Sequence, residues 1–387
     1  MLRPIPYDIC TGTMLGVGPP VRCAAATVAD PLVALEQAVL PALRRPPCVV
    51  SFSGGLDSSL VLAAAVRVAR REGLPDPVPV TWRFTGAPRA DESAWQDRVV
   101  RALAVGGSWQ VLSADDDLDL VGPVARRLLH RYGVLHPVNL HLHLPIVEIA
   151  AGGSLLTGLG GDQVLAGWRR PPPTSTRARV GRLRHDVRAW LRRRRLPLAG
   201  FPWLHPPVAR EVHRAYRAEQ RHEPRPLGAR IDWHLRRRDL LLTCSAFGAV
   251  AADHDVTLIH PLLDGGFHTS LAERAGHRRH VSRDALVAEI SGGSLPAEIT
   301  WPRRKARFLE VFFRDPTRGF VASWDGTGVD PDLVDVAALR ELWSRWPIPG
   351  GTAGLVQQLW LAANPPPPRP APRVPANRSE PDTEVTW

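Results

Sequence analysis

A run of serines and glycines with one aspartate, residues 53–59, has the composition and spacing of a phosphate-binding turn. Residues 48–51 before it predict a buried strand, and residues 60–69 after it predict an apolar helix. Glycine lets the backbone approach a phosphate and take up positive φ, so several N–H groups can point at one anion. The helix dipole and the serine hydroxyls would add to that attraction. The lysine of a Walker loop is absent, which indicates another class of phosphate-binding loop. The alternative is a serine cap on an ordinary turn between strand and helix.

A single lysine, Lys305, stands among 48 arginines. Abundant Arg, Ala and Pro indicate a GC-rich coding bias that replaces surface lysines by arginines. Arginine is a wide fork that stays charged, whereas lysine is a compact point charge that can donate a proton. A site that needs the second kind of group would keep its lysine, so Lys305 is a candidate catalytic residue. Chance survival of one lysine is the alternative.

A second glycine-rich turn carries an acid. Residues 154–157 predict an apolar strand, and Asp162 lies in the turn that follows it. Ligands of parallel sheets bind at the carboxyl ends of the strands, near a switch in strand order. Mg²⁺ takes one or two carboxylates together with nucleotide phosphate oxygens. We therefore expect Asp57 and Asp162 to bind Mg²⁺ at neighbouring strand ends; a plain turn at 160–162 is the alternative.

The elements that must position these turns alternate between strand and helix from residue 48 to 168. This order predicts an α/β fold, a parallel sheet with helices on both faces, followed by a C-terminal helical lobe. The predicted strands are 48–52, 78–84, 109–113 and 154–157. The helices predicted between these strands are 57–72, 91–105, 119–132 and 138–151. From residue 233 onward the pattern is helical, with predicted helices at about 233–251, 265–275, 282–291, 304–314, 332–345 and 352–363.

Several motifs resemble those of one superfamily. S-G-G-L-D-S-S at 53–59 looks like the loop of the N-type ATP pyrophosphatases, which cleave ATP between the α- and β-phosphates. With T-G-L-G-G-D at 157–162, L-P-A-E-I at 295–299 and R-R-K-A-R-F at 303–308, it is similar to the synthetase domain of asparagine synthetases. That family includes β-lactam synthetases and the macrolactam cyclases that close lasso peptides. H-P-L-L-D at 260–264 resembles its P-F-L-D segment, and the resemblance spans roughly residues 32–315.

The resemblance implies an adenine nucleotide alpha hydrolase-like fold, ATP and Mg²⁺ as cofactors, and a role for each matched residue. Lys305 falls on the family's catalytic lysine, with Arg303 two residues before it, and would stabilise charge on the phosphates and the acyl intermediate. Thr157 and Gly158 would lie near the nucleotide, and Asp57 and Asp162 would bind Mg²⁺. The residues expected to hold pyrophosphate are Ser53, Gly54, Gly55, Asp57, Ser58 and Ser59.

The chain also departs from the family pattern. The amidotransferase members of the family expose a catalytic cysteine at residue 2, where this chain has Leu2. Only 47 residues precede the core strand. We therefore expect no glutamine hydrolysis. Gln163 replaces the family's glutamate in Gly-Asp-Glu. Thr257 replaces the acid four positions before the proline of P-F-L-D, and Ile259 replaces an arginine. These differences argue against asparagine synthetase proper and leave the general base open, with His254 or Asp255 as the local candidates.

The positive charge is concentrated in one segment. Between Arg169 and Leu240 the chain has twenty arginines and six acidic residues, a balance of +14, whereas the whole chain carries +11. Such a segment can attract an acidic precursor peptide or a partner protein; a solvated helical excursion is the alternative. We do not expect nucleic acid as a partner. His130, His136, His141 and His143 have poor spacing for a metal site, so core or pocket histidines are expected.

The sequence predicts five parts and a cytoplasmic enzyme. The four cysteines form no CxxC or zinc motif, no apolar run approaches the roughly 20 residues of a membrane span, and no secretory signal is evident. The parts are a lead-in helix in 1–47, an ATP pyrophosphatase core in 48–168, an arginine-rich helical excursion in 169–240, a helical synthetase lobe with the lysine motif in 241–363, and a Pro-rich disordered tail in 364–387.

We therefore expect an ATP-dependent carbon–nitrogen ligase that forms an acyl-adenylate, releases pyrophosphate and transfers the acyl group to an amine. The expected substrate is a peptide or small carboxylate, in lasso-type macrolactam biosynthesis. Three alternatives stay open. The first is amidation with free ammonia, as in asparagine synthetases. The second is a tRNA-modifying ATP pyrophosphatase, which no CxxC or zinc site supports. The third is a binding protein that kept the fold but has no catalytic activity.

Overall fold

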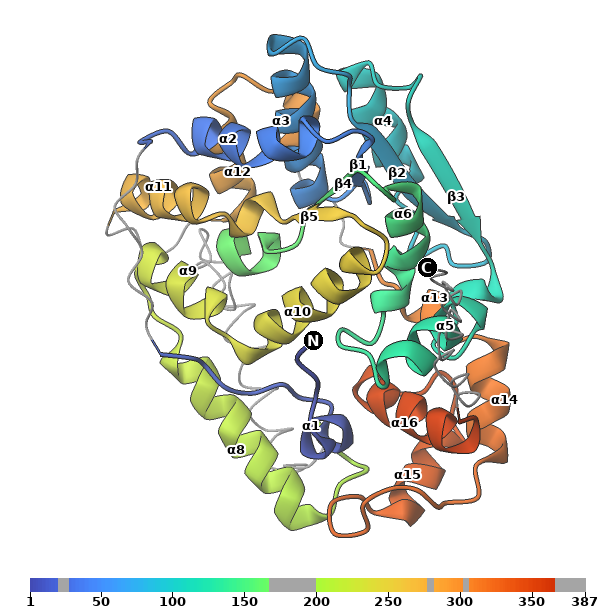
Figure 1. Cartoon of the computed structure of the whole chain (residues 1–387). Helices are drawn as coiled ribbons and strands as arrows, with labels where there is room; N and C mark the ends of the chain where they lie inside the picture. Colours follow the sequence, from blue (N-terminus) through green and yellow to red (C-terminus); the bar gives the residue numbers. More distant parts are fainter. Residues whose placement is uncertain (20–27, 167–199, 277–281, 302–305, 366–387) are drawn as a thin grey trace, which may run out of the picture.

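A five-stranded parallel sheet in the order β3-β2-β1-β4-β5 lies at the centre of the α/β part of the protein (Figure 1). The computed structural model describes residues 1–19, 28–166, 200–276, 282–301 and 306–365. From β1 the chain moves outward through β2 and β3 and then returns to β4 on the other side of β1, so the strand order reverses between β1 and β4. The strands are β1 (Cys48–Ser51), β2 (Val78–Phe84), β3 (Gln110–Ala114), β4 (Ser154–Thr157) and β5 (Thr257–Ile259).

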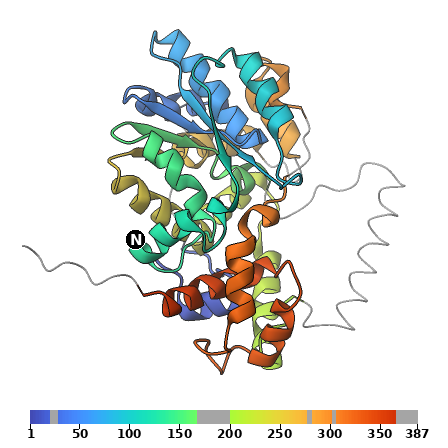
Figure 2. The ribbon, with the colours of Figure 1, turned by 90° about the vertical axis from the view of Figure 1, so that its right-hand side faces the viewer.

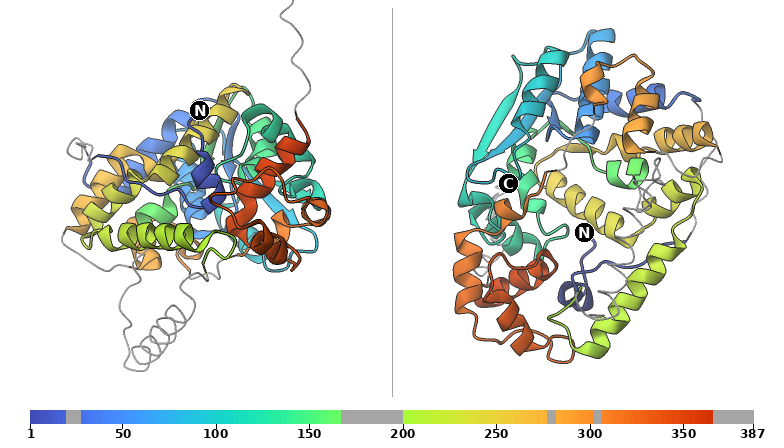
Figure 3. Two further views of the ribbon diagram at one scale, coloured as in Figure 1. Left: turned by 90° about the horizontal axis from the view of Figure 1, so that it is seen from below. Right: turned by 180° about the vertical axis from the view of Figure 1, so that it is seen from behind.

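Both faces of the central strands are buried, as expected for a parallel sheet covered by helices. Successive side chains of a strand point to opposite faces, so Val49 and Val50 enter two different cores. One core contains α2 (Pro31–Leu43), α3 (Leu56–Arg71), α4 (Ser93–Leu103), α11 (Gly265–Ala275) and α12 (Arg283–Ser291). The other contains α5 (Pro123–Tyr132), α6 (Leu144–Ile149) and α10 (Arg238–Ala252). Viewed from behind, β3 lies at one margin of the molecule and α11 at the other (Figure 3).

The C-terminal helices form a lobe on the side of the molecule away from α2 and α3 (Figures 1 and 2). Its core is continuous with the second core of the sheet, because Trp343, Leu355 and Trp360 belong to the same cluster as Val49 and Leu155. The predicted α/β fold with a C-terminal helical lobe is therefore confirmed. The lobe contains α13 (Leu309–Phe312), α14 (Asp315–Ser323), α15 (Val336–Trp343) and α16 (Ala353–Ala363), with α1 (Pro6–Thr11) packed on α16; α8 (Pro206–His222) and α9 (Leu227–Leu235) precede α10.

The lobe also holds the loop that precedes the turn at residues 140–143. Gln357 of α16 is fully buried, accepts a hydrogen bond from the Leu135 amide at 3.1 Å and donates one to the Val138 carbonyl at 2.9 Å. These bonds hold the segment that leads into the 3₁₀ turn η2 (Leu140–His143). The remaining short turns are η1 (Asp116–Leu118), η3 (Asp162–Ala166, a π-turn), η4 (Pro261–Leu263), η5 (Ala297–Ile299) and η6 (Gly350–Thr352).

Some predicted elements differ from the structure. The sequence pattern gave no strand at β5, which has only three residues, too few for an alternating pattern to show, and lies directly before His260-Pro261. The sheet therefore draws on residues beyond 168. The helix predicted at 233–251 is two helices, α9 and α10, which meet near Arg237, and α14 was not predicted.

Other expectations fall on residues that the structure does not describe. These include the part of the arginine-rich segment within 167–199 and the tail from residue 366. Among the described helices, none combines the length and the hydropathy that a membrane span requires.

Candidate functional site

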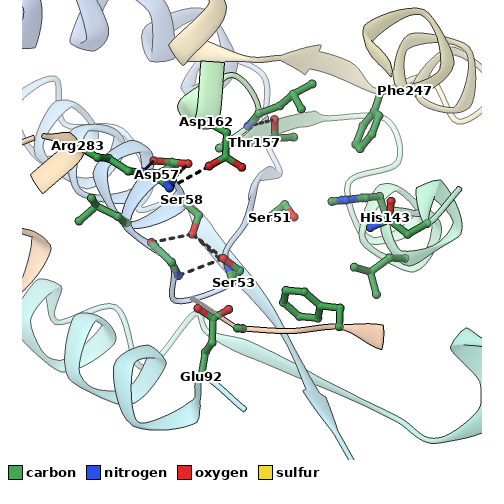
Figure 4. A pocket seen from close by; sticks show the side chains of 18 of the residues that line it. Ser51, Ser53, Asp57, Ser58, Glu92, His143, Thr157, Asp162, Phe247 and Arg283 are labelled. Atoms are coloured by element: carbon green, nitrogen blue, oxygen red, sulfur yellow. Dashed lines mark hydrogen bonds and ion pairs between the residues drawn. The ribbon is translucent and has the colours of Figure 1, made fainter. Parts of the chain in front are cut away.

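A cavity of about 420 Å³ opens at the carboxyl ends of β1 and β4, where the strand order reverses (Figure 4). Ser51 and Ser53 line it from the end of β1, and Thr157 and Gly158 line it from the end of β4. A crevice at such a switch point is where ligands of open α/β sheets bind. Both predicted turns therefore contribute to one cavity.

The first turn, residues 53–55, is held by its own side chains. The Ser53 amide donates to the Ser58 hydroxyl at 3.3 Å, and the Gly55 amide donates to the Ser53 hydroxyl at 3.1 Å. The two hydroxyl oxygens lie 3.1 Å apart. Gly54 has φ +89°, the left-handed region that glycine occupies without strain. Hydroxyls and amides are thus gathered at the N-terminus of the sixteen-residue helix α3, a suitable place for an anion.

The second turn, residues 158–162, packs so closely on the start of α3 that no side chain fits at Gly158 or Gly161. A Cβ atom on Gly158 would lie 2.8 Å from the Ser58 amide nitrogen. A Cβ atom on Gly161 would lie 2.0 Å from the carboxyl carbon of Asp57. The glycines of this motif are therefore needed for close backbone approach, and this approach brings Asp57 and Asp162 to one place.

An arginine joins the two aspartates. Arg283, the first residue of α12, donates from Nε to Asp57 Oδ1 at 3.0 Å and from Nη1 to Asp162 Oδ1 at 3.0 Å, and it also pairs with Asp57 Oδ2 (Figure 4). One guanidinium thus bridges the two carboxylates. Arg283 was not a predicted site residue. It lies between motifs, and no spacing rule connects it to residues more than a hundred positions earlier.

The two carboxylates suit a magnesium ion that is shared with a nucleotide. Within the part of the chain that the structure describes, no group of three or more His, Cys, Asp or Glu side chains could hold a metal alone. Mg²⁺ does not need such a group, because it commonly uses one or two carboxylates and completes its shell with phosphate oxygens and water. Asp57 and Asp162 already bind one cationic group, the guanidinium of Arg283, so these donors fit a cation at this point.

Most of the predicted nucleotide-binding residues line the cavity: Ser53, Gly55, Asp57, Ser58, Thr157 and Gly158. Gly54 and Ser59 do not line it. Ser59 is fully buried and its hydroxyl donates to the Gly55 carbonyl at 2.7 Å, so its visible role is to build the turn. Lys305 and Arg303 lie outside the described residues. Ala306 and Phe308, which follow Lys305 in the chain, do line the cavity.

The far end of the cavity is mainly apolar. Leu142, His143, Leu159, Phe247 and Phe308 line it, and the rings of His143 and Phe247 lie 4.6 Å apart. A smaller cavity of about 70 Å³ adjoins this end and shares His143 and Phe308 with it. Aromatic and aliphatic side chains dominate its wall: Phe52, Val80, Trp82, Phe84, Ala90, Leu142 and Ile146.

Two histidines near this end are held in the neutral form. Burial lowers the pKa of His143 to about 4, with smaller contributions from the neighbouring His260 and His141. Burial also lowers the pKa of His260 to about 4, and its Nδ1 is hydrogen-bonded to the Thr157 hydroxyl at 2.7 Å. Neither ring carries a charge at neutral pH.

The expectation of core or pocket histidines holds for the two members of the group nearest the cavity. His141 is fully buried and bonds to the Leu118 carbonyl, and His143 lines the cavity. His130, by contrast, is exposed. Phe247, which belongs to none of the motifs described above, also lines the cavity. Only the tertiary packing of α10 against η2 could have shown this.

The candidate general bases His254 and Asp255 lie at the wrong edge of the sheet. Both precede β5, and a parallel strand starts at the amino edge and ends at the carboxyl edge where the cavity lies. Arg45 pairs with Asp255 at 2.9 Å and also bonds to the Gly152 carbonyl, just before β4. These residues therefore face away from the cavity. The error follows from the missed strand, since its direction decides which neighbours reach the site.

A comparison with known families agrees with this geometry. The family model described as asparagine synthase matches residues 33–363, which include both turns, Arg283 and the Lys305 segment. No curated protein matches the chain. The match covers most of the chain and implies ATP-dependent carbon–nitrogen ligase activity. On this evidence the chain belongs to the asparagine synthase family.

Proposed function

We propose that this protein is an AMP-forming amide ligase that activates a carboxylate as an acyl-adenylate and transfers the acyl group to an amine. The carboxylate oxygen attacks the α-phosphorus of ATP, the bond to the bridging oxygen breaks, and pyrophosphate leaves. The amine nitrogen then attacks the acyl carbon, and AMP leaves with the electrons of the broken C–O bond. The observation that carries the proposal is the convergence of Asp57, Asp162 and the Ser53 turn on one cavity.

Each group at the phosphate end has an assigned task in this proposal. The Gly55 amide and the Ser53 and Ser58 hydroxyls would bind the leaving pyrophosphate, beside the N-terminus of α3. Asp57 and Asp162 would hold Mg²⁺, and this ion would supply positive charge against the phosphate oxygens. Lys305, with Arg303 near it in the chain, would stabilise the negative charge that develops on the phosphates and on the acyl intermediate. Catalysis here consists of positioning and charge neutralisation.

The small adjoining cavity is the proposed site of the adenine ring. Its wall is mainly aromatic and aliphatic, which suits a flat base, and Glu92 and Gln96 are polar members of it. The cavity lies beside Ser51 and Ser53, where the phosphate turn begins. Trp82 and Phe84 of β2 and Phe308 contribute rings to this wall. The larger apolar end is then left for the carboxylate substrate and its acceptor.

At the level of the substrate, we propose a peptide carboxylate whose amine acceptor belongs to the same molecule, as in lasso-type macrolactam formation. The replacement of the family's acid by Thr257 supports this choice over asparagine synthesis. The arginine-rich segment supports an acidic precursor peptide as the partner. Amidation with free ammonia remains the second candidate, because the family match favours it.

The test is ATP–pyrophosphate exchange with a panel of peptides that carry Asp or Glu, and with free aspartate plus ammonium as a separate arm. We expect exchange and AMP with a peptide, and a loss of about 100-fold in Lys305→Arg, the magnitude typical of a lost charge-stabilising group. Arg307→Lys is the matched control, since Arg307 is an exposed residue of the same segment. ADP as product would refute the proposal. So would absence of exchange in every arm.

A further inference from the structure

His143 is a half-buried basic group that lines the proposed adenine site but has no proton-transfer role in the adenylation step. It lines both the main cavity and the smaller one, and it is part of η2, which α16 holds through Gln357. Among the described residues, its Nδ1 has no hydrogen-bond partner although the atom is buried. A buried, unpaired ring nitrogen costs free energy unless a ligand group meets it. The ring is thus an unused polar group at the apolar end of a substrate cavity.

The second half of the proposed reaction needs such a group. When an amine attacks an acyl carbon, its nitrogen becomes cationic and must lose a proton before a stable amide remains. The charged side chains that line the cavity in the described part of the chain are Asp57, Glu92, Asp162, Arg283 and Asp284. Of these, Glu92 also lines the smaller cavity with His143, and it lies against Gly54 and Gly55 of the phosphate turn. Among the described residues that line the apolar end, His143 is the basic side chain.

We propose that the apolar end of the cavity, formed by Leu142, His143, Phe247 and Phe308, is the subsite for an uncharged acceptor amine on an apolar residue, and that His143 takes the proton released on attack. This inference rests on the proposed ligase function. The amine enters after losing its first proton to solvent. The C–N bond forms, the second proton passes to the imidazole, the C–O bond to AMP breaks, and AMP leaves with the electron pair. The imidazolium then returns the proton to water.

The neighbouring histidines do not fit this role. His260 is not among the residues lining either cavity, and its Nδ1 is bonded to the Thr157 hydroxyl. His141 is fully buried and its Nε2 is bonded to the Leu118 carbonyl. These two rings, with Phe247, surround His143 and keep it neutral, so it can accept a proton at pH 7. A weakly basic ring is sufficient because an N-protonated amide is a strong acid.

The experiment separates the two half-reactions in the full-length protein. With the peptide that supports pyrophosphate exchange, His143→Ala and His143→Gln should keep exchange within about threefold of wild type. Their amide formation should fall by about 10²–10⁴-fold, the usual contribution of a general base. Hydroxylamine, whose attack does not depend on a base in this way, should trap the acyl-adenylate of His143→Ala at the wild-type rate. His254→Ala, at the opposite edge of the sheet, is the matched control and should leave both steps unchanged.

The outcomes distinguish this inference from the function on which it rests. Absence of exchange in the wild-type protein would refute the ligase proposal itself. Normal exchange together with normal amide formation in His143→Ala would refute the role of His143 alone. An equal loss of exchange and amide formation in both variants would indicate a structural role and would also overturn the inference. Rescue of His143→Ala by added imidazole, with no effect on the wild type, is the further expected result.

Discussion

Replacement of Arg283 by glutamine is a sharp test of the site, because this guanidinium bridges the two aspartates expected to bind the metal. Arg283 lies 3.0 Å from Asp57 Oδ1 and 3.0 Å from Asp162 Oδ1. A divalent cation that approaches these carboxylates must displace the guanidinium or bind beside it. Removal of the guanidinium should therefore increase the affinity of the free protein for a divalent cation.

The magnitude follows from Coulomb's law. Two unit charges about 4 Å apart interact by about 1 kcal/mol in water, so a divalent cation beside the guanidinium is opposed by about 2 kcal/mol. The value for water is a lower bound, because the side chains of Arg283 and Asp57 are only 26% and 14% exposed. Physiological salt screens part of this repulsion. We expect Arg283→Gln to bind a divalent cation about tenfold more tightly than the wild type.

The assay is Mn²⁺ binding to the nucleotide-free protein, followed by electron paramagnetic resonance. Arg274→Gln is the matched control, because it removes the same charge from α11, where Arg274 pairs with Asp30 and Glu289 instead. Thermal unfolding of both variants shows whether they remain folded. An Mn²⁺ affinity of Arg283→Gln no higher than that of Arg274→Gln would refute the assignment of Asp57 and Asp162 to one cation site.

Two further predictions test the packing around the cavity. Gly161→Ala should lower the affinity for a fluorescent ATP analogue at least about tenfold in a titration with Mg²⁺, because the new methyl group would overlap the Asp57 carboxylate. The control is Gly107→Ala, which should bind the analogue normally because there is open space around Gly107. Equal binding by the two variants would contradict the close contact. The free energy of unfolding, measured with urea from pH 7 to pH 4.5, should fall as the pH falls below about 6.5. His143 and His260 have pKa values of about 4 in the folded protein, so unfolding takes up protons in this window. Each ring contributes up to about 1.4 kcal/mol per pH unit to the slope of the unfolding free energy against pH. A slope in His143→Phe as steep as in the wild type would show that this ring is not buried in the neutral form.

The local motifs of the sequence were sufficient to predict the two turns and the strands that carry them. A strand, a glycine-rich turn and a helix start are adjacent in the chain, so their geometry is set locally. The prediction that Asp57 and Asp162 lie together needed one further rule, that neighbouring parallel strands end at the same edge. Arg283 bonds to both carboxylates, so the structure agrees with this expectation.

The residues that line the rest of the cavity could not be predicted in this way. His143, Phe247 and Arg283 come from three elements whose contacts depend on the packing of η2, α10 and α12. The three-residue strand β5 gave no periodic signal, and its direction places His254 and Asp255, the local candidates for the general base, at the edge away from the cavity. The roles of Lys305 and Arg303 stay predictions from the resemblance and from the survival of a single lysine.

The central claim, that a carboxylate is adenylated in this cavity, has one direct test. The peptide that supports exchange is labelled with ¹⁸O in its carboxylates and turned over with ATP, and the phosphorus-containing products are analysed by mass spectrometry. The account predicts that one ¹⁸O atom appears in AMP for each amide formed, because the carboxylate oxygen has been bonded to the α-phosphorus. Label in inorganic phosphate with ADP as the other product, or AMP that carries no label, would contradict it.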